Sequence, residues 1–441
     1  MNIQKYRVWD PLYGLMDFSP LEAQFIFSPE VQRLRHVRLC NIDSLLLPGA
    51  ANVSRFEHAL GVLRLANEWL SVHHIHSDKA NDLRIAAIVH DIQSGPFGHS
   101  IQYILEDNKL GADFGHEDLA EAQAHSYHQD IPANESYVGV KFRVRAMCGE
   151  RWPIISDMIK GESQLGSLIS GTLDLDNLDN VIRLAFHTGL CSRIEAEQAI
   201  ELAKVIAPTP QGIAIPSQKV YLIEQWQKVR KNLYEFLLYD WAEFSAKAML
   251  TRAFEDAVGQ KFVGTDNWRM TDDELIQYFL DKAIGETQSV KEMVRRLRLG
   301  ELYTPILIGS SAAVENYKVL NQIKTKRNIE KEILRSVYKG RGGTQVLIHF
   351  ILDINKIERA VEVTLKDTLK QIEVGQNSRS LLIGVFTSAA PTPREREMLQ
   401  VKALQVLANS GCPEIRFIPD PLAKPKTPDN QMKLFNGPET T

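Results

Sequence analysis

Apolar residues recur at helical spacing through most of the first 300 positions. After Ser54, whose hydroxyl can cap a helix start, leucine, alanine and tryptophan side chains form a wide apolar stripe. Residues 82–91 are apolar nearly all round, which predicts a helix that is buried on every side. The same spacing predicts further helices at 174–190, 195–206 and 217–257, and two more within 271–298.

Two serine–proline pairs mark earlier helix starts. Ser19–Pro20 and Ser28–Pro29 each place an N-cap before a proline at the first helical position. The second helix is expected to run through P-E-V-Q-R-L-R-H-V-R-L, and its arginines Arg33, Arg35 and Arg38 lie mostly off the apolar side. Two interpretations of these arginines stay open: a solvated basic face, or a surface that binds anions.

The hydrophobic pattern changes after about residue 300. β-rich runs at 345–352, 381–387 and 414–418 flank a helical stretch at 393–409, and a loop with a short strand is predicted at 212–215. The predicted fold is therefore mainly α, with a helical core and a smaller C-terminal α+β lobe.

At 441 residues the chain is too long for one ordinary core, so we expect two or three substructures. The changes of pattern predict a helical region with a helical extension over 1–300, the α+β lobe over 301–425 and a flexible polar tail over 426–441.

Composition narrows the class of protein. A net charge of −4 argues against a surface coated with basic residues for duplex DNA, although a local basic groove remains open. Four scattered cysteines form no C-x-x-C pair, which argues against a disulfide scaffold or a structural zinc site. No segment has the apolar length of a signal core or a membrane span, so we expect a soluble, cytoplasmic protein. P-loop and G-x-G-x-x-G motifs are absent from the sequence.

Histidines and a carboxylate gather between residues 54 and 99. His58 follows the Ser54 cap, the pair His90–Asp91 ends the predicted buried helix, and His99 closes the segment. An unpaired carboxylate at the end of a buried helix would be costly, and coordination of a divalent metal removes that cost. A further carboxylate must come from elsewhere, and local spacing leaves three candidates open: Asp174, Asp176 and Asp179.

An ordered set of short segments then suggests a family. The segments are D-P-L-Y-G, Q-R-L-R-H-V-R-L, L-P-G-A, R-F-E-H-A-L-G-V, V-H-D-I-Q-S-G-P-F-G-H, G-H-E and L-D-N-L-D-N-V-I-R. Together they resemble the HD-domain phosphohydrolases, specifically the deoxynucleotide triphosphohydrolase branch that includes the SAM-and-HD-domain enzyme and bacterial dGTPases. The resemblance covers roughly residues 5–260, and the later lobe resembles the same branch more loosely.

The resemblance implies a catalytic site within the helical region. Matching the family's motifs residue by residue gives His58, His90, Asp91 and Asp176 as metal ligands, His99 and His116 as catalytic residues, and Arg55 and Arg230 as substrate-phosphate residues. Two histidines and two carboxylates suit Mn, Fe, Co, Ni, Zn or Mg, so the metal is not identified. The implied activity is hydrolysis of a dNTP to deoxynucleoside and triphosphate by metal-activated water.

Several positions depart from the family's pattern. Ser94 stands where a histidine is frequent, and Gln102 stands where a carboxylate is usual, with Glu106 one turn further on. Residues that would contact the sugar, the phosphates or an activating guanine nucleotide are replaced by Leu39, Asn177, Asn180, Leu184, Leu238 (beside Tyr239) and Phe27. The metal and phosphate chemistry is thus expected to be kept, whereas dNTP selectivity and nucleotide activation are in question.

These departures leave alternative functions open. One is a nucleotidase or single-strand nuclease with the same metal centre, and another is a non-catalytic module that binds nucleotide or DNA. The tail segment Gln431–Phe435 (Q-M-K-L-F) resembles the Q-x-x-L-F peptide that docks to the bacterial DNA sliding clamp, with Gln431, Leu434 and Phe435 as the contact residues. A homo-oligomer is expected from the resemblance alone.

Overall fold

The computed structural model describes residues 6–40, 52–98, 143–209, 212–263, 267–268, 270–337 and 344–419. Its mainly helical fold with a smaller sheet-containing C-terminal part confirms the predicted fold class. None of the described helices combines the length and the apolar character that crossing a membrane requires.

The chain begins with an antiparallel hairpin and two short helices. The elements are β1 (Tyr6–Asp10), β2 (Gly14–Phe18), α1 (Pro20–Ile26) and α2 (Pro29–Arg33). Both helices start at the predicted serine caps, because each serine side chain accepts a hydrogen bond from a backbone N–H of the first turn.

The predicted second helix is shorter than expected. It ends at Arg33, a 3-10 turn covers Leu34–His36, and Val37 is extended. Arg33 is only 1% exposed, so it does not belong to a solvated basic face. Its guanidinium donates to the main-chain carbonyls of Ile92, Ser94 and Met270.

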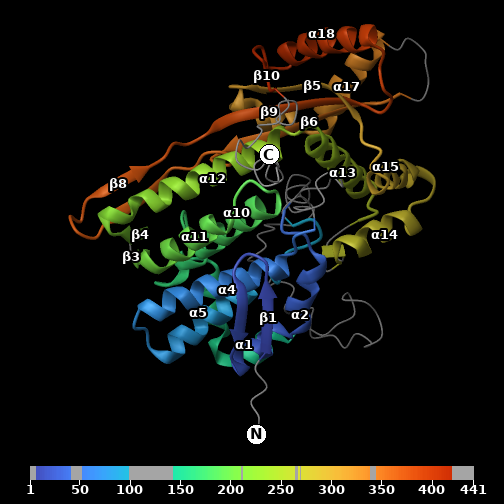
Figure 1. The fold of residues 1–441 in the computed structure, drawn as a ribbon. Coiled ribbons are helices and arrows are strands. Elements are labelled where there is room, and N and C mark those ends of the chain that lie inside the picture. The colour runs from blue at the N-terminus through green and yellow to red at the C-terminus, as the bar shows by residue number, and fades with distance from the viewer. Residues whose placement is uncertain are drawn as a thin grey trace, which may run out of the picture.

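A set of packed helices forms the lower half of the molecule in Figure 1. They are α4 (Arg55–Val72), α5 (Ser77–Val89), α8 (Val144–Cys148), α9 (Trp152–Ile159), α10 (Leu175–His187), α11 (Arg193–Val205) and α12 (Val220–Tyr239). Helix α4 packs against α5, α10 and α11, and α10 also packs against α12. Their apolar stripes share one hydrophobic core.

The single long helix predicted over 217–257 is wrong, because Asp240 divides it in two. Asp240 has an extended backbone, and its carboxylate accepts from the N–H groups of Ala242 and Glu243, so it caps a new helix. Helix α12 therefore ends at Tyr239, and α13 (Trp241–Gly259) begins in a new direction. Helices α14 (Asp272–Lys282) and α15 (Gln288–Arg298) follow, as predicted.

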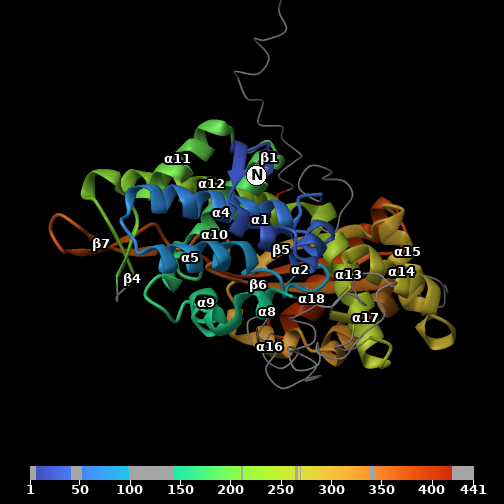
Figure 2. The same ribbon diagram turned by 90° about the horizontal axis from the view of Figure 1, so that it is seen from below.

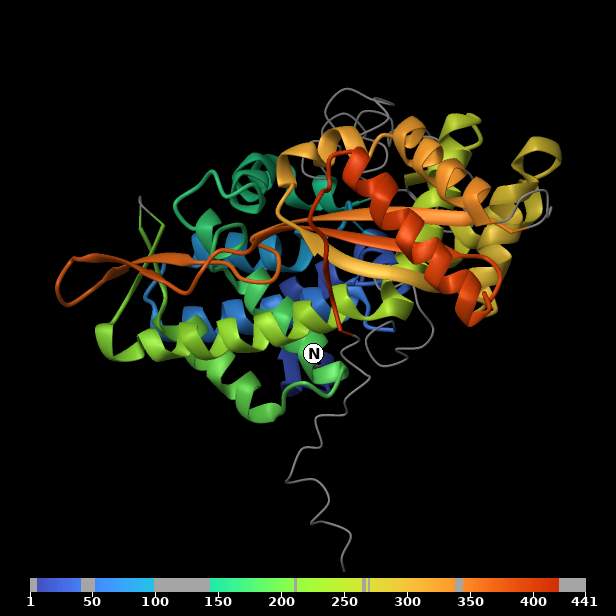
Figure 3. The ribbon, with the colours of Figure 1, turned by 90° about the horizontal axis from the view of Figure 1, so that it is seen from above.

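A four-stranded antiparallel sheet forms the centre of the C-terminal lobe. Its strands lie in the order β10 (Arg416–Phe417), β5 (Thr304–Ser311), β9 (Arg379–Thr387) and β6 (Val346–Ile354). Successive side chains along these strands point to opposite faces of the sheet, so they pack into two different hydrophobic cores. One face packs on α17 (Ile323–Val337) and α18 (Pro393–Asn409), and the other packs on α13 and its neighbours. Figure 3 shows α18 crossing over this sheet.

A second sheet joins the lobe to the helical region. Its strands are β3 (Ala207–Thr209), β4 (Gly212–Ile215), β7 (Val361–Leu365) and β8 (Gln371–Val374). Strands β4 and β7 pair in parallel although about 150 residues separate them, and they lie side by side in Figure 2. Val361, Val363 and Val374 belong to the helical core. The division at residue 300 thus remains a prediction about folding units, since both a sheet and a core cross it.

Candidate metal centre

Helix α4 supplies the first functional histidine. The Ser54 hydroxyl accepts from the N–H of Glu57, which fixes the helix start just before Arg55. Arg55 and His58 lie three residues apart and therefore share one face of the helix. Both are buried, at 4% and 1% exposure, so this face looks into the protein rather than into solvent.

The pair His90–Asp91 follows directly after α5. The Nδ1 atom of His90 lies 2.9 Å from the carbonyl oxygen of Ala87. A carbonyl can only accept, so Nδ1 carries the ring proton and Nε2 has a free lone pair. That lone pair faces Nε2 of His58 at 3.3 Å.

Helix α10 distinguishes the three aspartates that the sequence left open. Asp174 is the N-cap, and its carboxylate accepts from the N–H groups of Asn177 and Gly171. Oδ1 of Asp176 lies 2.8 Å from Nε2 of His58, whereas Oδ2 of Asp179 lies 2.8 Å from Nδ1 on the opposite edge of the ring. Asp176 is therefore on the same side of His58 as His90, and Asp179 is behind the ring.

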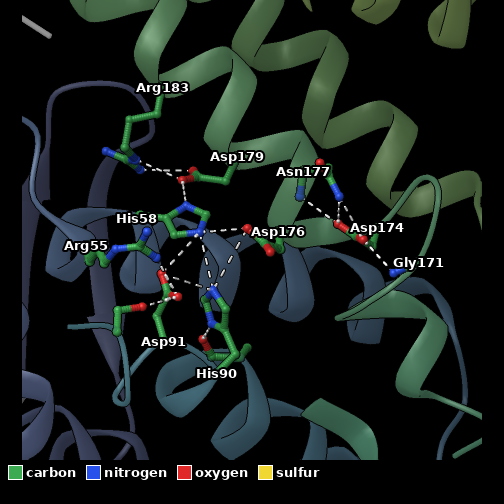
Figure 4. A network of polar contacts seen from close by, with 12 residues as sticks. Arg55, His58, His90, Asp91, Gly171, Asp174, Asp176, Asn177, Asp179 and Arg183 are labelled. Carbon is green, nitrogen blue, oxygen red and sulfur yellow. Dashed lines mark hydrogen bonds and ion pairs between the residues drawn. The ribbon is translucent and has the colours of Figure 1, made fainter. Parts of the chain in front are cut away.

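Figure 4 shows that four side chains from three segments converge on one point. Nε2 of His90 lies 4.0 Å from Oδ1 of Asp176, and Oδ2 of Asp91 lies 3.7 Å from His90 Nε2 and 4.0 Å from His58 Nε2. Metal–ligand bonds of about 2.0–2.2 Å place neighbouring donors about 3 Å apart, so small movements would bring this set onto one ion.

The electrostatics at this point also favour a cation. Burial disfavours the charged form of His58, but the carboxylates of Asp176 and Asp179 outweigh that effect and raise its pKa to about 9. His58, His90 and Asp176 have possible ligand atoms within 4.8 Å of one another. Two imidazole nitrogens and carboxylate oxygens fit a divalent first-row metal, so the residues present are suited to the group that the sequence implied.

A buried chain of charges holds His58 from behind. Asp179 accepts from Arg183 through both oxygens, at 2.9 and 3.0 Å, and Arg183 also donates to Asp10 at 2.9 Å. Asp179 fixes the His58 ring so that Nε2 points into the site, as outer carboxylates do for metal-bound histidines. Gly61 makes room for this pair, because a Cβ there would collide with the Asp179 carboxylate and the Arg183 guanidinium. Sequence reasoning missed Arg183 and Asp10, although the i,i+4 spacing of Asp179 and Arg183 was a usable signal.

Arg55 holds the other carboxylate of the site. Its Nη1 atom lies 2.6 Å from Oδ1 of Asp91, and the Ser94 hydroxyl donates to the same oxygen at 3.0 Å. Ser94 is one of the departures from the family pattern, and here it acts as a partner of Asp91. The second oxygen of Asp91 is the one that faces the two histidines.

The comparisons with known proteins agree with this geometry. The family model for the HD domain matches residues 55–135. The chain contains an HD domain. It is 21% identical over 392 residues to the deoxynucleoside triphosphate triphosphohydrolase SAMHD1 of Danio rerio, a match that covers 78% of this chain and 62% of that relative. It is 22% identical to the SAMHD1 homolog of Dictyostelium discoideum, over 67% of this chain and 58% of the relative. The uncharacterized protein YwfO of Bacillus subtilis is 26% identical over 52% of this chain and 50% of its own length.

The HD-domain loop after Asp91 is held by residues from far along the chain. The indole N–H of Trp268 donates to the carbonyl of Gln93 at 2.8 Å, and Asp272 accepts from the N–H of Phe97 at 2.7 Å. Arg33 binds two further carbonyls of the same loop. Helix α14 and its preceding residues thus position a loop that lies about 175 residues earlier.

A cavity of about 850 Å³ opens from the HD-domain site, a volume within the usual range for ligand pockets. Arg55, His90, Asp91 and Asp176 line one end. Five of the positions that depart from the family also line it, namely Leu39, Asn177, Asn180, Leu184 and Leu238. Phe27 is elsewhere, 59% exposed and in contact with Tyr6.

Arg230 lies on the cavity wall and is anchored there. It is 2% exposed, its guanidinium lies 4.5 Å from the ring centre of Tyr234, and its Nη2 donates to the carbonyls of Asn355 and Lys356. The Nε and Nη1 atoms have no hydrogen-bond partner among the described residues. The expected phosphate-binding role of Arg230 remains a prediction, and the contacts show a second role in fixing the Asn355–Lys356 turn.

The remaining predicted positions lie outside the described residues. These are His99, His116, Gln102 and Glu106, together with the clamp-peptide positions Gln431, Leu434 and Phe435.

Proposed function

We propose that this chain is a metal-dependent phosphohydrolase of nucleotides and that deoxynucleoside triphosphates are its principal substrates. One observation carries the proposal: His58, His90, Asp91 and Asp176 converge beside a nucleotide-sized cavity that His90, Asp91 and Asp176 line together with Arg55 and Arg230. The similarity to deoxynucleoside triphosphate triphosphohydrolases supports the substrate class.

The donor set would hold a divalent cation through His58, His90, Asp91 and Asp176. When bound, such a cation polarises a phosphoryl oxygen and lowers the pKa of a coordinated water. The chain's own residues perform the remaining tasks. Asp179 holds His58 in one tautomer, and the Ala87 carbonyl does the same for His90.

Arg55 places a guanidinium at the same end of the cavity. Its bond to Asp91 fixes its orientation, and it offers further N–H donors to phosphate oxygens. The apolar side chains of Leu39, Leu184 and Leu238 replace polar contacts to the sugar. An apolar wall rejects an added hydroxyl only weakly, so we expect deoxy-over-ribo selectivity of no more than about a hundredfold.

A turnover assay tests the proposal. The purified chain would be incubated with Mn²⁺, Mg²⁺, Co²⁺ or Ni²⁺ and with dNTPs, NTPs, nucleoside monophosphates or single-stranded oligonucleotides, and triphosphate would be separated from phosphate. We expect triphosphate release from dNTPs, and loss of that release in His90→Ala and Asp176→Asn. Phosphate release from monophosphates would favour a nucleotidase, and shortened oligonucleotides would favour a nuclease. No turnover with any substrate and metal would contradict the hydrolase proposal.

A further inference from the structure

The wall of the cavity that α13 and the C-terminal lobe supply has a charge pattern unlike that of the metal centre. Four cationic side chains line it: Lys247 on α13, Lys318 on α16 (Tyr317–Leu320), and Lys356 and Arg359 after β6. We call these four residues the cationic wall. Within the described part of the chain, none of the four side chains forms an ion pair or a hydrogen bond.

The carboxylates near the cationic wall do not neutralise it. Glu255 also lines the cavity, but it is bonded to Lys326 and lies 3.5 Å from Arg252, two cations outside the wall. Glu243, one turn before Lys247, is one further lining carboxylate. Four cations therefore share the lining with two carboxylates, of which Glu255 is paired with Lys326, and the buried Asp353 lies beside Lys356, so the wall keeps an excess of positive charge.

Lys356 is held in place by contacts on both sides of its backbone. Its N–H donates to Asp353 at 3.0 Å, and its carbonyl accepts from Arg230 at 2.8 Å. The preceding residue, Asn355, has a φ of 57°, a left-handed conformation that asparagine adopts more readily than most residues with a side chain. The turn is thus fixed by its backbone contacts to Asp353 and Arg230.

Two neighbouring groups show the unbalanced charge directly. Burial and then the charge of Lys247 lower the pKa of Lys356 to about 8, and the smaller opposing effect of Asp353 does not cancel them. His349 on β6 also lines the cavity, is 7% exposed and makes no side-chain hydrogen bond among the described residues, and the charges of Lys326 and Lys247 act with burial to lower its pKa. An anion between the amines would relieve this repulsion and give the imidazole a partner.

We propose that Lys247 and Lys356 form a subsite for the terminal phosphate groups of a nucleotide whose scissile phosphate lies at the metal centre. The assignment rests on the proposed function for the position of the scissile phosphate. Arg230 lies beside the subsite, because it lines the same cavity and binds the carbonyl of Lys356. The subsite explains why the cations are left without protein partners: phosphate oxygens would supply them.

A binding experiment without metal tests the subsite independently of turnover. Inorganic tripolyphosphate would be titrated calorimetrically into the full chain in the presence of EDTA. We expect binding by the unaltered chain, and an affinity lower by at least about tenfold in Lys247→Met/Lys356→Met, since each lost charge-assisted contact is of that size. The variant keeps both aliphatic stems, and Lys247→Arg/Lys356→Arg should restore most of the affinity.

The control removes the same charge elsewhere. Lys228 on α12 and Lys370 before β8 are exposed lysines without ion pairs in the described structure, so Lys228→Met/Lys370→Met should bind tripolyphosphate as the unaltered chain does. Equal affinity in the Lys247→Met/Lys356→Met variant, or no binding by the unaltered chain, would overturn the subsite whether or not nucleotides are hydrolysed.

Kinetics then test whether the bound phosphates belong to the substrate. Tripolyphosphate should compete with a nucleoside triphosphate, and Lys247→Met/Lys356→Met should raise KM about tenfold for the triphosphate but not for a monophosphate. Inhibition that leaves KM unchanged would place tripolyphosphate on a separate effector site and overturn the assignment to substrate. If no nucleotide is hydrolysed although tripolyphosphate binding depends on both lysines, the hydrolase proposal fails and the subsite stands.

Discussion

His58 and His349 are both buried histidines, and their surroundings shift their pKa values in opposite directions. Burial disfavours the imidazolium at each position. At His58 two aspartates outweigh burial and raise the pKa to about 9, whereas at His349 Lys326 and Lys247 act with burial and hold the pKa well below 6.5. The first environment stabilises a positive charge, and the second repels one.

The same difference extends to the residues around each histidine. Around His58 the carboxylates outnumber the arginines, because Arg183 is shared by Asp10 and Asp179 and no arginine among the described residues pairs with Asp176. Near His349 the lining lysines Lys247 and Lys356 form no ion pair among the described residues, whereas Lys326 is paired with Glu255. A protein that binds a cation and a polyanion side by side requires this division, because each ligand completes the charge that its own region lacks. The three predictions below test the division.

The largest effect on stability is expected from breaking the buried Asp10–Arg183–Asp179 chain of charges. Arg183→Met leaves Asp10 and Asp179 as two buried carboxylates without their shared cation, and Arg183 itself is fully buried. Loss of one partner from a buried pair destabilises by about 3 to 5 kcal/mol. The free energy of unfolding, measured by urea titration, should fall by that amount. Arg7→Met removes an exposed partner of Asp17 and should change stability little. Similar losses in the two variants would contradict the assigned role of the buried chain.

The next effect concerns metal affinity rather than stability. Asp179→Asn keeps an oxygen that can accept from His58 Nδ1 but removes the charge behind the ring. Loss of an outer partner of a metal-bound histidine weakens metal binding by about 10- to 100-fold. Competitive titration with a metal-responsive chelator measures this affinity directly.

A matched variant at Asp174 tests whether Asp179 and Asp174, the two aspartates that do not face His90, differ in their effect on metal affinity. Asp174→Asn retains an N-cap, and the Asp174 oxygens bond to Asn177 and Gly171 rather than to the site, so its metal affinity should stay close to that of the unaltered chain. Equal losses of affinity in the Asp179 and Asp174 variants would show that the two carboxylates are not distinguished as the geometry indicates.

Most helices and the metal-centre motifs could be predicted because they depend on local pattern. Ser54 caps α4 as its sequence context indicates, and the β4 strand at Gly212–Ile215 has its predicted bounds. The break at Asp240 was missed because the helical spacing continues through it, and only the cap contacts reveal a new helix. Arg33 was misplaced for a related reason: the carbonyls it binds come from residues about 60 and 240 positions away.

The cavity was the part least open to prediction. Its two ends come from segments that are brought together only by tertiary packing, such as the β4–β7 pairing and the anchoring of the Lys356 turn by Arg230. These contacts produce no periodicity or motif in the amino-acid sequence. The family resemblance ended near residue 260, so Lys356 and Arg359 were outside the segment from which roles could be carried over.

The smallest expected effect is the contribution of His349, on the cation-rich side of the cavity, to the pH dependence of stability. The folded pKa of His349 lies below the unfolded value of 6.5, so above pH 6.5 the residue is neutral in both states and its contribution is constant. Below pH 6.5 the unfolded chain gains a proton that the folded chain excludes, and stability falls by about 1.4 kcal/mol per pH unit from this residue alone.

His349→Gln should remove this contribution to the pH dependence of the free energy of unfolding, measured by urea titration at pH 7.5, 6.5 and 5.5. His74→Gln, at an exposed position, should retain it. If the His349→Gln variant showed the same pH dependence of unfolding free energy as the unaltered chain, the surrounding cations would not repel charge at this position. Tripolyphosphate should also reduce the slope, because an anion beside Lys247 and Lys356 would let the folded chain accept the proton at a higher pH.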